Sequence, residues 1–232
     1  MEHPNIVTFE VTGEYGLFSD PVMRVGGEKF SYPIPTYEAL KGIAASIYWK
    51  PTFFWLIDRV RVMNPIRTEV KGIRPIKFNS HENDLAYYTY LKKCRYQVQA
   101  HFEWNMNRPE FENDRDENKH HQIAKRMVER GGRRDIFLGA RECQGYVTPC
   151  VFGEGDGAYD SVEAMDFGLM YHGITYADEA YSDTTKGNMT VRFWYPVMRK
   201  GVIDFCRPED CPRHKLIRKM PMKMFPDKQE VR

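Results

Sequence analysis

Alternation between apolar and polar residues marks the strands expected in the first half of the chain. Residues 6–12, Ile-Val-Thr-Phe-Glu-Val-Thr, have the period of two that is typical of a half-buried strand. Runs of alternating, aromatic or β-branched side chains predict further strands over residues 53–63, 66–78, 93–104, 136–138 and 146–152. The run at 66–78 is expected to continue the run at 53–63 as a hairpin.

Two segments instead place apolar residues three or four positions apart, which is the spacing of a helix with one buried face. The first segment begins after Thr36, a suitable N-cap residue, and ends before Pro51. The second covers residues 119–130, with Asn118 as the expected N-cap and Gly131 as the residue just past its end. Two helices are therefore expected among many strands.

The predicted order of elements, βαββαβ, corresponds to a ferredoxin-like layout, so we expect an α+β fold. The polar and acidic stretch at 105–117 is expected to be a mobile loop within it. Beyond residue 155 alternation continues without a helical segment, which predicts a small antiparallel β-sheet. We expect a ferredoxin-like domain over residues 1–155, a β-sheet subdomain over 156–212 and a basic, flexible tail over 213–232.

Charge is distributed unevenly along the 232 residues, although the formal net charge is only +2. Residues 154–183 contain eight acidic residues and no Lys or Arg, which leaves +10 for the remainder of the chain. Six basic residues lie within 59–77 and six within 125–141, against one and two acidic residues. Two such clusters favour a polyanion as partner, whereas either cluster alone is equally well explained as a solvated surface.

Cysteine spacing and hydropathy exclude several other classes of protein. The five cysteines are widely spaced, and the closest pair, Cys206 and Cys211, matches neither the zinc nor the redox spacings, so we expect reduced thiols and no metal. The acidic residues at 154–183 fit no calcium loop. No stretch is long and apolar enough for a membrane helix, and the N-terminal residues have no signal-peptide pattern, so a cytoplasmic protein without membrane contact is expected.

The start of the second helix is the first candidate for chemistry, because it combines Lys119, His120 and His121. The positive end of a helix dipole favours anions, so cations placed there suggest that a bound phosphate supplies the missing negative charge. The alternative is a solvated turn neutralised by nearby acidic side chains, namely Asp114, Asp116 and Glu117. Spacing alone leaves both interpretations open.

A second candidate is the glycine-rich stretch that carries Arg133, Arg134 and Arg141. Arginine grips phosphate oxygens with two donors, and glycine lets a backbone approach a phosphate closely. Tyr48 is a weaker candidate, because it lies on the same helical face as apolar residues and spacing favours a core tyrosine.

Seven ordered segments carry a resemblance to a known family, at residues 31–43, 46–51, 62–68, 71–75, 131–139, 141–143 and 191–194. Together they resemble the type I-C CRISPR-associated endoribonuclease, the "d" variant of the Cas-five family in the RAMP superfamily. The likeness extends over nearly the whole chain to about Phe205.

The resemblance implies an RRM-type, ferredoxin-like N-terminal domain and a small C-terminal β-sheet domain. It implies cleavage of the CRISPR precursor RNA at the base of each repeat hairpin without a metal or other cofactor, by attack of a ribose 2′-OH. The product, the mature guide RNA, would stay bound with the other subunits of the interference complex. The family's catalytic residues carry over to Tyr48, Lys119 and His120, with His121 as a fallback because the two histidines are in tandem.

The residues expected to contact RNA are Arg67, Lys71, Arg74, Arg133, Arg134, Arg141 and His121. The main alternative is a non-catalytic subunit that caps the 5′ end of a guide RNA. A metal-dependent nuclease that uses the acidic segment and a protein that binds double-stranded DNA are further alternatives.

Overall fold

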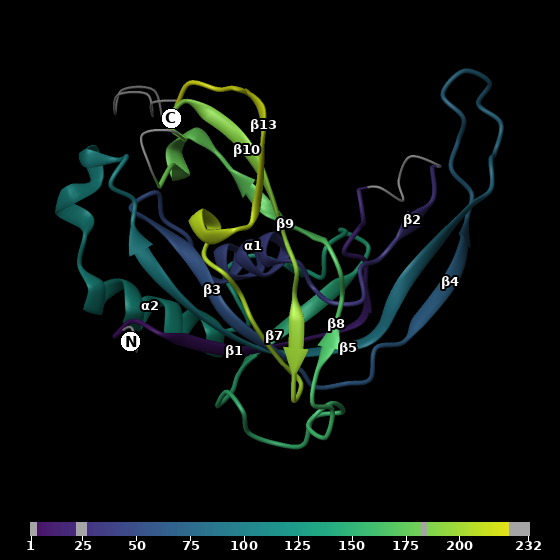
Figure 1. Ribbon diagram of the computed structural model, residues 1–232, viewed down its shortest axis with the longest axis horizontal. Helices are drawn as coiled ribbons and strands as arrows, with labels where there is room; N and C mark the ends of the chain where they lie inside the picture. The colour runs from purple at the N-terminus through teal and green to yellow at the C-terminus, as the bar shows by residue number, and fades with distance from the viewer. Residues whose placement is uncertain (1–3, 22–26, 182–184, 223–232) are drawn as a thin grey trace.

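The computed structural model describes residues 4–21, 27–181 and 185–222 (Figure 1). The elements of its first part are β1 (Val7–Gly16), β2 (Lys29–Phe30), α1 (Tyr37–Ile47), β3 (Phe53–Val62), β4 (Thr68–Ile73), β5 (Ala86–Trp104), η2 (Pro109–Asp114), α2 (Glu117–Glu129), β6 (Ile136–Phe137) and β7 (Gln144–Pro149). Those of its second part are β8 (Met165–Asp166), β9 (Met170–Thr175), η3 (Ala177–Glu179), β10 (Asn188–Trp194), β11 (Val197–Arg199), β12 (Val202–Asp204), η4 (Pro208–Asp210) and β13 (Arg213–Lys219).

Ten strands of the described residues form one sheet, in the order β6-β7-β1-β5-β3-β12-β11-β8, with β2 and β4 also paired to β5. The pairings are antiparallel except that of β2 with β5. The two α-helices pack against the strands β1, β3 and β7 and contact each other. The expected α+β class, with few helices and mostly antiparallel strands, is therefore confirmed. No helix in the described part of the chain is long and apolar enough to cross a membrane.

Helix α1 is positioned as its sequence predicts. The Thr36 side chain accepts a hydrogen bond from the Ala39 N–H and so satisfies one of the unpaired donors of the first turn. Leu40, Ala44 and Ile47 are buried on one face. The helix ends at Tyr48, whose backbone is extended with φ of −156°.

Helix α2 begins two residues earlier than predicted. Its N-cap is Asp116 and not Asn118, because the Asp116 carboxylate accepts the Lys119 N–H. At the other end Gly131 has φ of +80°, as the prediction of a terminating glycine requires. Its N–H donates to the Val128 carbonyl, and the Gly132 N–H donates to the Met127 carbonyl. This pair of bonds is a Schellman motif, which closes the helix.

The stretch expected as a mobile loop, 105–117, contains an ordered turn of 3₁₀ helix, Pro109–Asp114, so that prediction is wrong for these residues. The Arg115 guanidinium donates to the carbonyls of Asn105 and Arg108, each at 3.2 Å. A half-buried guanidinium that donates to two backbone acceptors holds the segment against the end of β5.

The pairing of β4 differs from the predicted hairpin. β4 pairs with the first part of β5, where Lys71 lies opposite Tyr88, while β3 pairs with the last part, where Phe53 lies opposite Trp104. β5 is long enough for both partners because the strand covers 19 residues. As a result, β3 and β4 lie end to end along β5, and β4 forms part of an arm that extends away from the helices (Figure 1).

The second part of the chain divides between two sheets. β8, β11 and β12 extend the main sheet beyond β3, whereas β9, β10 and β13 form a separate three-stranded antiparallel sheet. The prediction of a flexible tail is wrong for Arg213–Lys219, which forms β13 and pairs with β10. Residues 223–232 of the predicted tail lie outside the described residues. The predicted domain boundaries stay a prediction.

Candidate active site

Tyr48 and His120 come together where the end of α1 meets the start of α2. The Tyr48 hydroxyl lies 2.8 Å from Nδ1 of His120. Nε2 of the same ring lies 2.7 Å from the Asp114 carbonyl oxygen, which can only accept. Nε2 therefore carries a proton, and in the neutral ring Nδ1 accepts the Tyr48 O–H.

The His120 imidazole is enclosed by aromatic side chains. Its exposed fraction is 0%, and that of Tyr48 is 2%. The rings of Phe53 and Trp104 lie 5.3 and 5.8 Å from the His120 ring, centroid to centroid. Both ring nitrogens are thus used by protein atoms in this arrangement, and solvent does not reach them.

Asp114 connects this enclosed pair to the surface. Its carboxylate accepts from the Lys119 ammonium at 2.5 Å and from the Thr52 hydroxyl at 2.8 Å, while its carbonyl holds His120. Lys119 holds the pKa of Asp114 below its ordinary value. The sequence suggested Asp114 only as a charge that neutralises a solvated turn. In the structure it pairs with Lys119, and its carbonyl oxygen also accepts a hydrogen bond from His120.

Tyr48 is a proton donor and not a base near neutral pH. Burial raises its pKa to about 12, and the negative charge of Asp114 acts in the same direction. Its backbone carbonyl also accepts the Trp55 indole N–H at 2.7 Å, which fixes the residue between helix and sheet. Tyr48 is therefore buried, as spacing favoured, and also contacts the candidate histidine.

The second histidine of the tandem points elsewhere. Nε2 of His121 lies 2.9 Å from the Ile6 carbonyl oxygen, beside the start of β1. Successive residues of a helix point about 100° apart, so only one of the two can face Tyr48. The geometry thus favours His120 over His121 as the partner of Tyr48 and Lys119.

Arg133 and Arg134 lie at the same end of α1. Their backbone N–H groups donate to the last carbonyls of α1, those of Ser46 and Ile47, so these donors are not available for a phosphate as the glycine-rich sequence had suggested. The side chains line a cavity of about 370 Å³ together with Trp49 and Lys50. Three cationic groups and an indole that is 45% exposed therefore surround one hollow next to Tyr48 in the chain.

The other predicted RNA contacts lie far from this cavity. Arg67, Lys71 and Arg74 belong to the β4 arm, and Lys71 lies opposite Tyr88 of β5. Trp104, which contacts His120, is sixteen residues further along β5, or up to about 50 Å at ~3.3 Å per residue.

Lys71 also has partners of its own, because its ammonium lies 3.4 Å from the centre of the Tyr15 ring and 3.8 Å from Glu69. Arg141 is exposed in the turn after β6. The residues that converge are thus Tyr48, Lys119, His120, Arg133 and Arg134.

Trp49, Lys50 and Thr52 were missed from the sequence, although they follow Tyr48 directly. The available signal was a cation and an aromatic side chain just past the end of a helix.

The acidic stretch after residue 153 is partly structural, since Asp160 accepts two hydrogen bonds from the buried Arg61. Among the described residues the group able to hold a metal ion is His172, Cys206 and Cys211, away from this site.

Comparison with known proteins agrees with the sequence resemblance. A model of the Cas5d family, described as CRISPR-associated protein (Cas_Cas5), matches residues 6–206. A solved structure described as that of a CRISPR-associated protein has 33% sequence identity and a TM-score of 0.76, over 90% of this chain and 96% of that chain.

Two curated relatives share the name CRISPR pre-crRNA endoribonuclease Cas5d. The relative from Mannheimia succiniciproducens is 40% identical over 65 residues, 28% of either chain. The relative from Thermus thermophilus is 43% identical over 54 residues, 23% of either chain. The matched segments thus span about a quarter of these two relatives. Because the family match covers most of the chain and the solved structure matches nearly all of it, this chain belongs to the Cas5d family of CRISPR-associated proteins.

Proposed function

We propose that this chain is an endoribonuclease that cleaves CRISPR precursor RNA at the base of the repeat hairpin. The observation that carries the proposal is the 2.8 Å contact between the Tyr48 hydroxyl and the His120 imidazole, with Lys119 in the same helical turn. The name of the curated relatives, CRISPR pre-crRNA endoribonuclease, supports the same substrate and reaction. We also propose that the product stays bound and that the protein acts as a subunit of the type I-C interference complex.

The proposed reaction is an internal transfer that consumes no water. The ribose 2′-oxygen bonds to the neighbouring phosphorus while the bond from phosphorus to the 5′-oxygen breaks, which leaves a 2′,3′-cyclic phosphate and a 5′-OH. His120 would take the 2′-OH proton at Nδ1, the nitrogen that faces Tyr48. Tyr48, protonated because burial raises its pKa to about 12, would orient the ring or give a proton to the departing 5′-oxygen.

Lys119 is proposed to stabilise the charge that develops on the non-bridging phosphate oxygens, together with the N-terminal end of α2. It would do so by exchanging its Asp114 partner for the phosphate. His120 is enclosed, so the reaction also requires the segment that ends at Asp114 to move away from the ring and the Tyr48 hydroxyl to turn away from Nδ1. We infer that binding of the RNA at this point brings about these changes.

The basic cavity beside Tyr48 is proposed to hold the RNA backbone. Arg133, Arg134 and Lys50 supply the cations, and the half-exposed Trp49 supplies a face on which an unpaired base can stack. An A-form stem offers mainly phosphates and 2′-OH groups to a protein, so unpaired bases next to the stem are the natural source of sequence preference.

We further propose that the first part of the chain is a ferredoxin-like unit. The strands that would form it, β1, β3, β5 and β7, are separated by α1 and α2 in the order βαββαβ. Their order in the sheet, β7-β1-β5-β3, has the fourth strand beside the first and the third between the first and the second. That order and its antiparallel pairings support the proposal.

The second candidate is a non-catalytic subunit that holds the 5′ end of a finished guide RNA. The enclosure of His120 and the pairing of Lys119 with Asp114 favour it, because both groups are inert in this arrangement. A subunit of this kind needs the basic cavity but has no use for a histidine that changes its proton.

Incubation of the purified protein with a repeat RNA in the presence of EDTA separates the two candidates. The endoribonuclease predicts cleavage that continues in EDTA, gives a cyclic phosphate end and falls by a factor of about 10² to 10⁴ in His120→Ala. His121→Ala is the matched control and is expected to cleave at nearly the wild-type rate. RNA binding without cleavage would support the guide-holding subunit, and activity that disappears in EDTA would contradict a metal-independent reaction.

Binding of double-stranded DNA is tested by the same preparation. Phosphate contacts dominate non-specific affinity and weaken steeply with salt, so affinities for repeat RNA and for a random duplex are compared at two salt concentrations. Preference for the repeat RNA that persists at the higher salt supports the proposed substrate. Equal affinities at both concentrations would support a general duplex-binding protein.

A further inference from the structure

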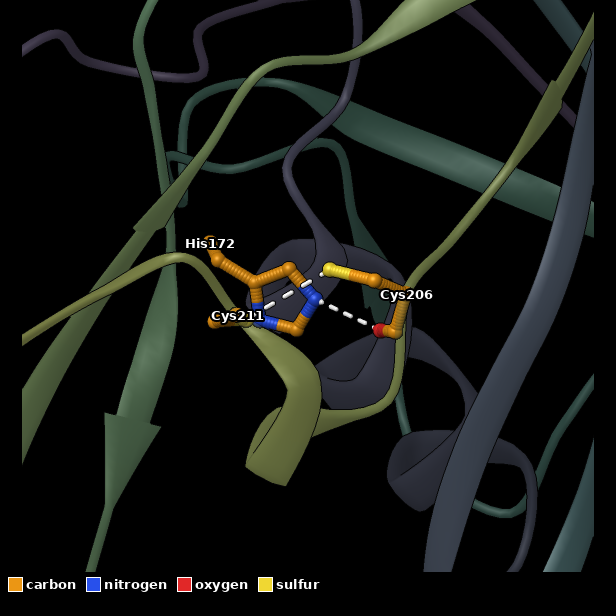
Figure 2. Close-up of side chains that lie close together, drawn as sticks. All are labelled: His172, Cys206 and Cys211. Atoms are coloured by element: carbon orange, nitrogen blue, oxygen red, sulfur yellow. Dashed lines mark hydrogen bonds between the residues drawn. The ribbon is translucent and has the colours of Figure 1, made fainter.

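Three potential metal ligands meet at the opposite end of α1 from the candidate active site. His172 comes from β9, Cys206 follows β12, and Cys211 follows the short helix η4 (Figure 2). One ligand atom from each residue lies within 4.8 Å of the others. His172 is completely buried and Cys211 is 5% exposed, while Cys206 is half-buried.

The distance between the two sulfur atoms fits a shared metal ion. Sγ of Cys206 and Sγ of Cys211 are 3.5 Å apart. Two thiolates bound to one tetrahedral zinc ion at ~2.3 Å are about 3.8 Å apart. A disulfide would require about 2.05 Å. The pair is therefore already close to the spacing of zinc ligands.

His172 is oriented as a metal-binding histidine usually is. Nε2 lies 3.1 Å from the Cys206 carbonyl oxygen and donates to it, so the lone pair is on Nδ1, which receives a long contact of 3.4 Å from Arg192. Neutral imidazole and thiolate are the ligand types that zinc prefers.

We propose that His172, Cys206 and Cys211 bind one zinc ion, with the fourth position taken by water. Binding removes one proton from each thiol, and both protons go to solvent. The thiolate charges balance the ion. Two soft thiolates and one imidazole favour zinc over magnesium or calcium, which require oxygen ligands.

Arg192 is the charged neighbour that this site must accommodate. Its Nε lies 3.4 Å from Nδ1 of His172, and its side chain also bonds to the Thr175 hydroxyl and lies 3.7 Å from a Glu38 oxygen. Zinc at Nδ1 replaces the long contact from Arg192. The Arg192 guanidinium keeps its contacts with Thr175 and Glu38. The two thiolates balance the zinc charge and Glu38 balances Arg192, so the buried charges remain balanced.

The position in the fold indicates a structural role. β9 belongs to the three-stranded sheet, whereas β12 belongs to the main sheet, so a shared ion would tie the two sheets together. The Tyr37 ring at the start of α1 stacks on His172 at 4.1 Å. Tyr48 is at the other end of this 11-residue helix, about 16 Å away at ~1.5 Å per residue. Zinc here stabilises the fold and takes no part in RNA cleavage.

The sequence alone did not indicate this site, because only Cys206 and Cys211 are close together in it. The third ligand lies 34 residues before Cys206, on a strand of the other sheet. Only the packing of β9 against the loop that follows β12 brings the histidine to the two thiols.

The zinc content of the purified full-length protein tests the proposal. The protein is produced with zinc in the medium, purified without metal-affinity resin and measured by elemental mass spectrometry. Wild type is expected to hold about one zinc per chain, and Cys206→Ser at least tenfold less. Cys150→Ser, which removes another half-buried thiol, is the matched control and is expected to keep its zinc.

Two further measurements use the wild-type protein, so they do not depend on folding of a variant. Removal of zinc by a strong chelator is expected to lower the melting temperature by about 10 °C, as for any ligand bound only by the folded state. Replacement by Co²⁺ is expected to give the charge-transfer absorption of a cobalt–thiolate bond, which Cys206→Ser loses or weakens.

The proposal is overturned by wild-type protein that holds no zinc after zinc loading, or by Cys206→Ser that retains a full equivalent. A disulfide between Cys206 and Cys211 in protein prepared under reducing conditions would also overturn it. The RNA cleavage assay is run below the melting temperature of the metal-free protein. Failure of the zinc site and failure of the proposed endoribonuclease can therefore be told apart.

Discussion

The cavity beside Tyr48 and the β4 arm have similar basic sequences but different surroundings. Arg133 and Arg134 are held at the end of α1 by their backbone N–H groups. At the same end the buried Tyr48 and His120 lie within hydrogen-bond distance of each other. Arg67 and Arg74 flank β4, on a two-sided ribbon whose outer side chains are largely exposed. A cluster of positive charge therefore indicates a polyanion partner, but only the packing around it indicates where chemistry can occur.

Removal of the Lys119 charge is expected to have the largest effect on this comparison. Lys119→Met keeps much of the side-chain volume and removes the cation proposed to stabilise the transition state, so the cleavage rate is expected to fall by about 10² to 10³. Single-turnover kinetics with a repeat RNA measure the effect. Lys125→Met, six residues further along α2, is the control and is expected to change the rate less than about threefold. Equal losses of cleavage rate in both variants would mean that Lys119 contributes only to the overall positive charge of the surface.

Tyr48→Phe is expected to lower the cleavage rate by about 10² while RNA affinity changes little. The phenyl ring preserves the packing against Phe53, but His120 loses its partner at Nδ1. The variant's pH–rate profile is the decisive measurement, because loss of a proton donor changes the shape of the profile, whereas a packing defect only lowers it. An unchanged profile with an unchanged rate would make Tyr48 a core tyrosine only.

The two basic regions can be compared directly through salt dependence. Arg133→Ala with Arg134→Ala is expected to weaken binding of a minimal repeat hairpin by about tenfold or more and to lower the slope of log affinity against log salt by about 1.4. Arg67→Ala with Arg74→Ala is expected to leave that short hairpin almost unaffected and to weaken only a longer RNA. Equal losses on the short hairpin would remove the distinction between the regions.

Trp49→Ala is expected to cost about 1 kcal/mol in RNA affinity, or roughly fivefold, through loss of base stacking. Tyr87→Ala on the arm is a matched control, since Tyr87 is 48% exposed and Trp49 is 45% exposed. Fluorescence titration with hairpins that differ in the unpaired base next to the stem measures both effects. Equal losses in the two variants would contradict a special role for the cavity.

The smallest expected effect concerns the Asp114–Lys119 ion pair. The folded-state pKa of Asp114 is lowered, so its contribution to stability is present above the unfolded value near 3.9 and is lost as pH falls through the folded value. Asp114→Asn should therefore lower the free energy of unfolding by less than about 1 kcal/mol at pH 7, and the difference should shrink as the pH falls below the unfolded pKa near 3.9. Urea unfolding at several pH values checks both statements, and a difference that does not shrink in acid would contradict them.

Local features of the sequence predicted the helices well. The Thr36 cap and the terminating Gly131 are set by neighbours within four residues, and both are confirmed. The burial of His120 rather than His121 was also within reach, because His120, Ala124 and Val128 recur at the four-residue spacing of one helix face and all three are buried. The residue types alone had left this choice open.

Features that depend on distant pairing could not be predicted in the same way. β4 pairs with β5 rather than with β3, and that pairing separates Lys71 from the helix ends. Arg213–Lys219 buries none of its seven residues, and it becomes a strand by pairing with the edge of β10. The whole sheet determines where a charged side chain is exposed and which strand pairs with an edge. A short stretch of sequence does not contain this information.

The enclosure of His120 has an energetic consequence for any RNA that is cut here. If the arrangement with the ring uncovered is populated at about 1%, the apparent affinity of a ligand that requires it is about 100-fold weaker than the intrinsic affinity. An RNA that makes few contacts elsewhere cannot offset this difference. Only a substrate with enough binding energy at the stem and its flanks would uncover the His120 ring. Selectivity for the repeat would then arise partly from the population of a minor protein conformation and not only from contacts to nucleobases.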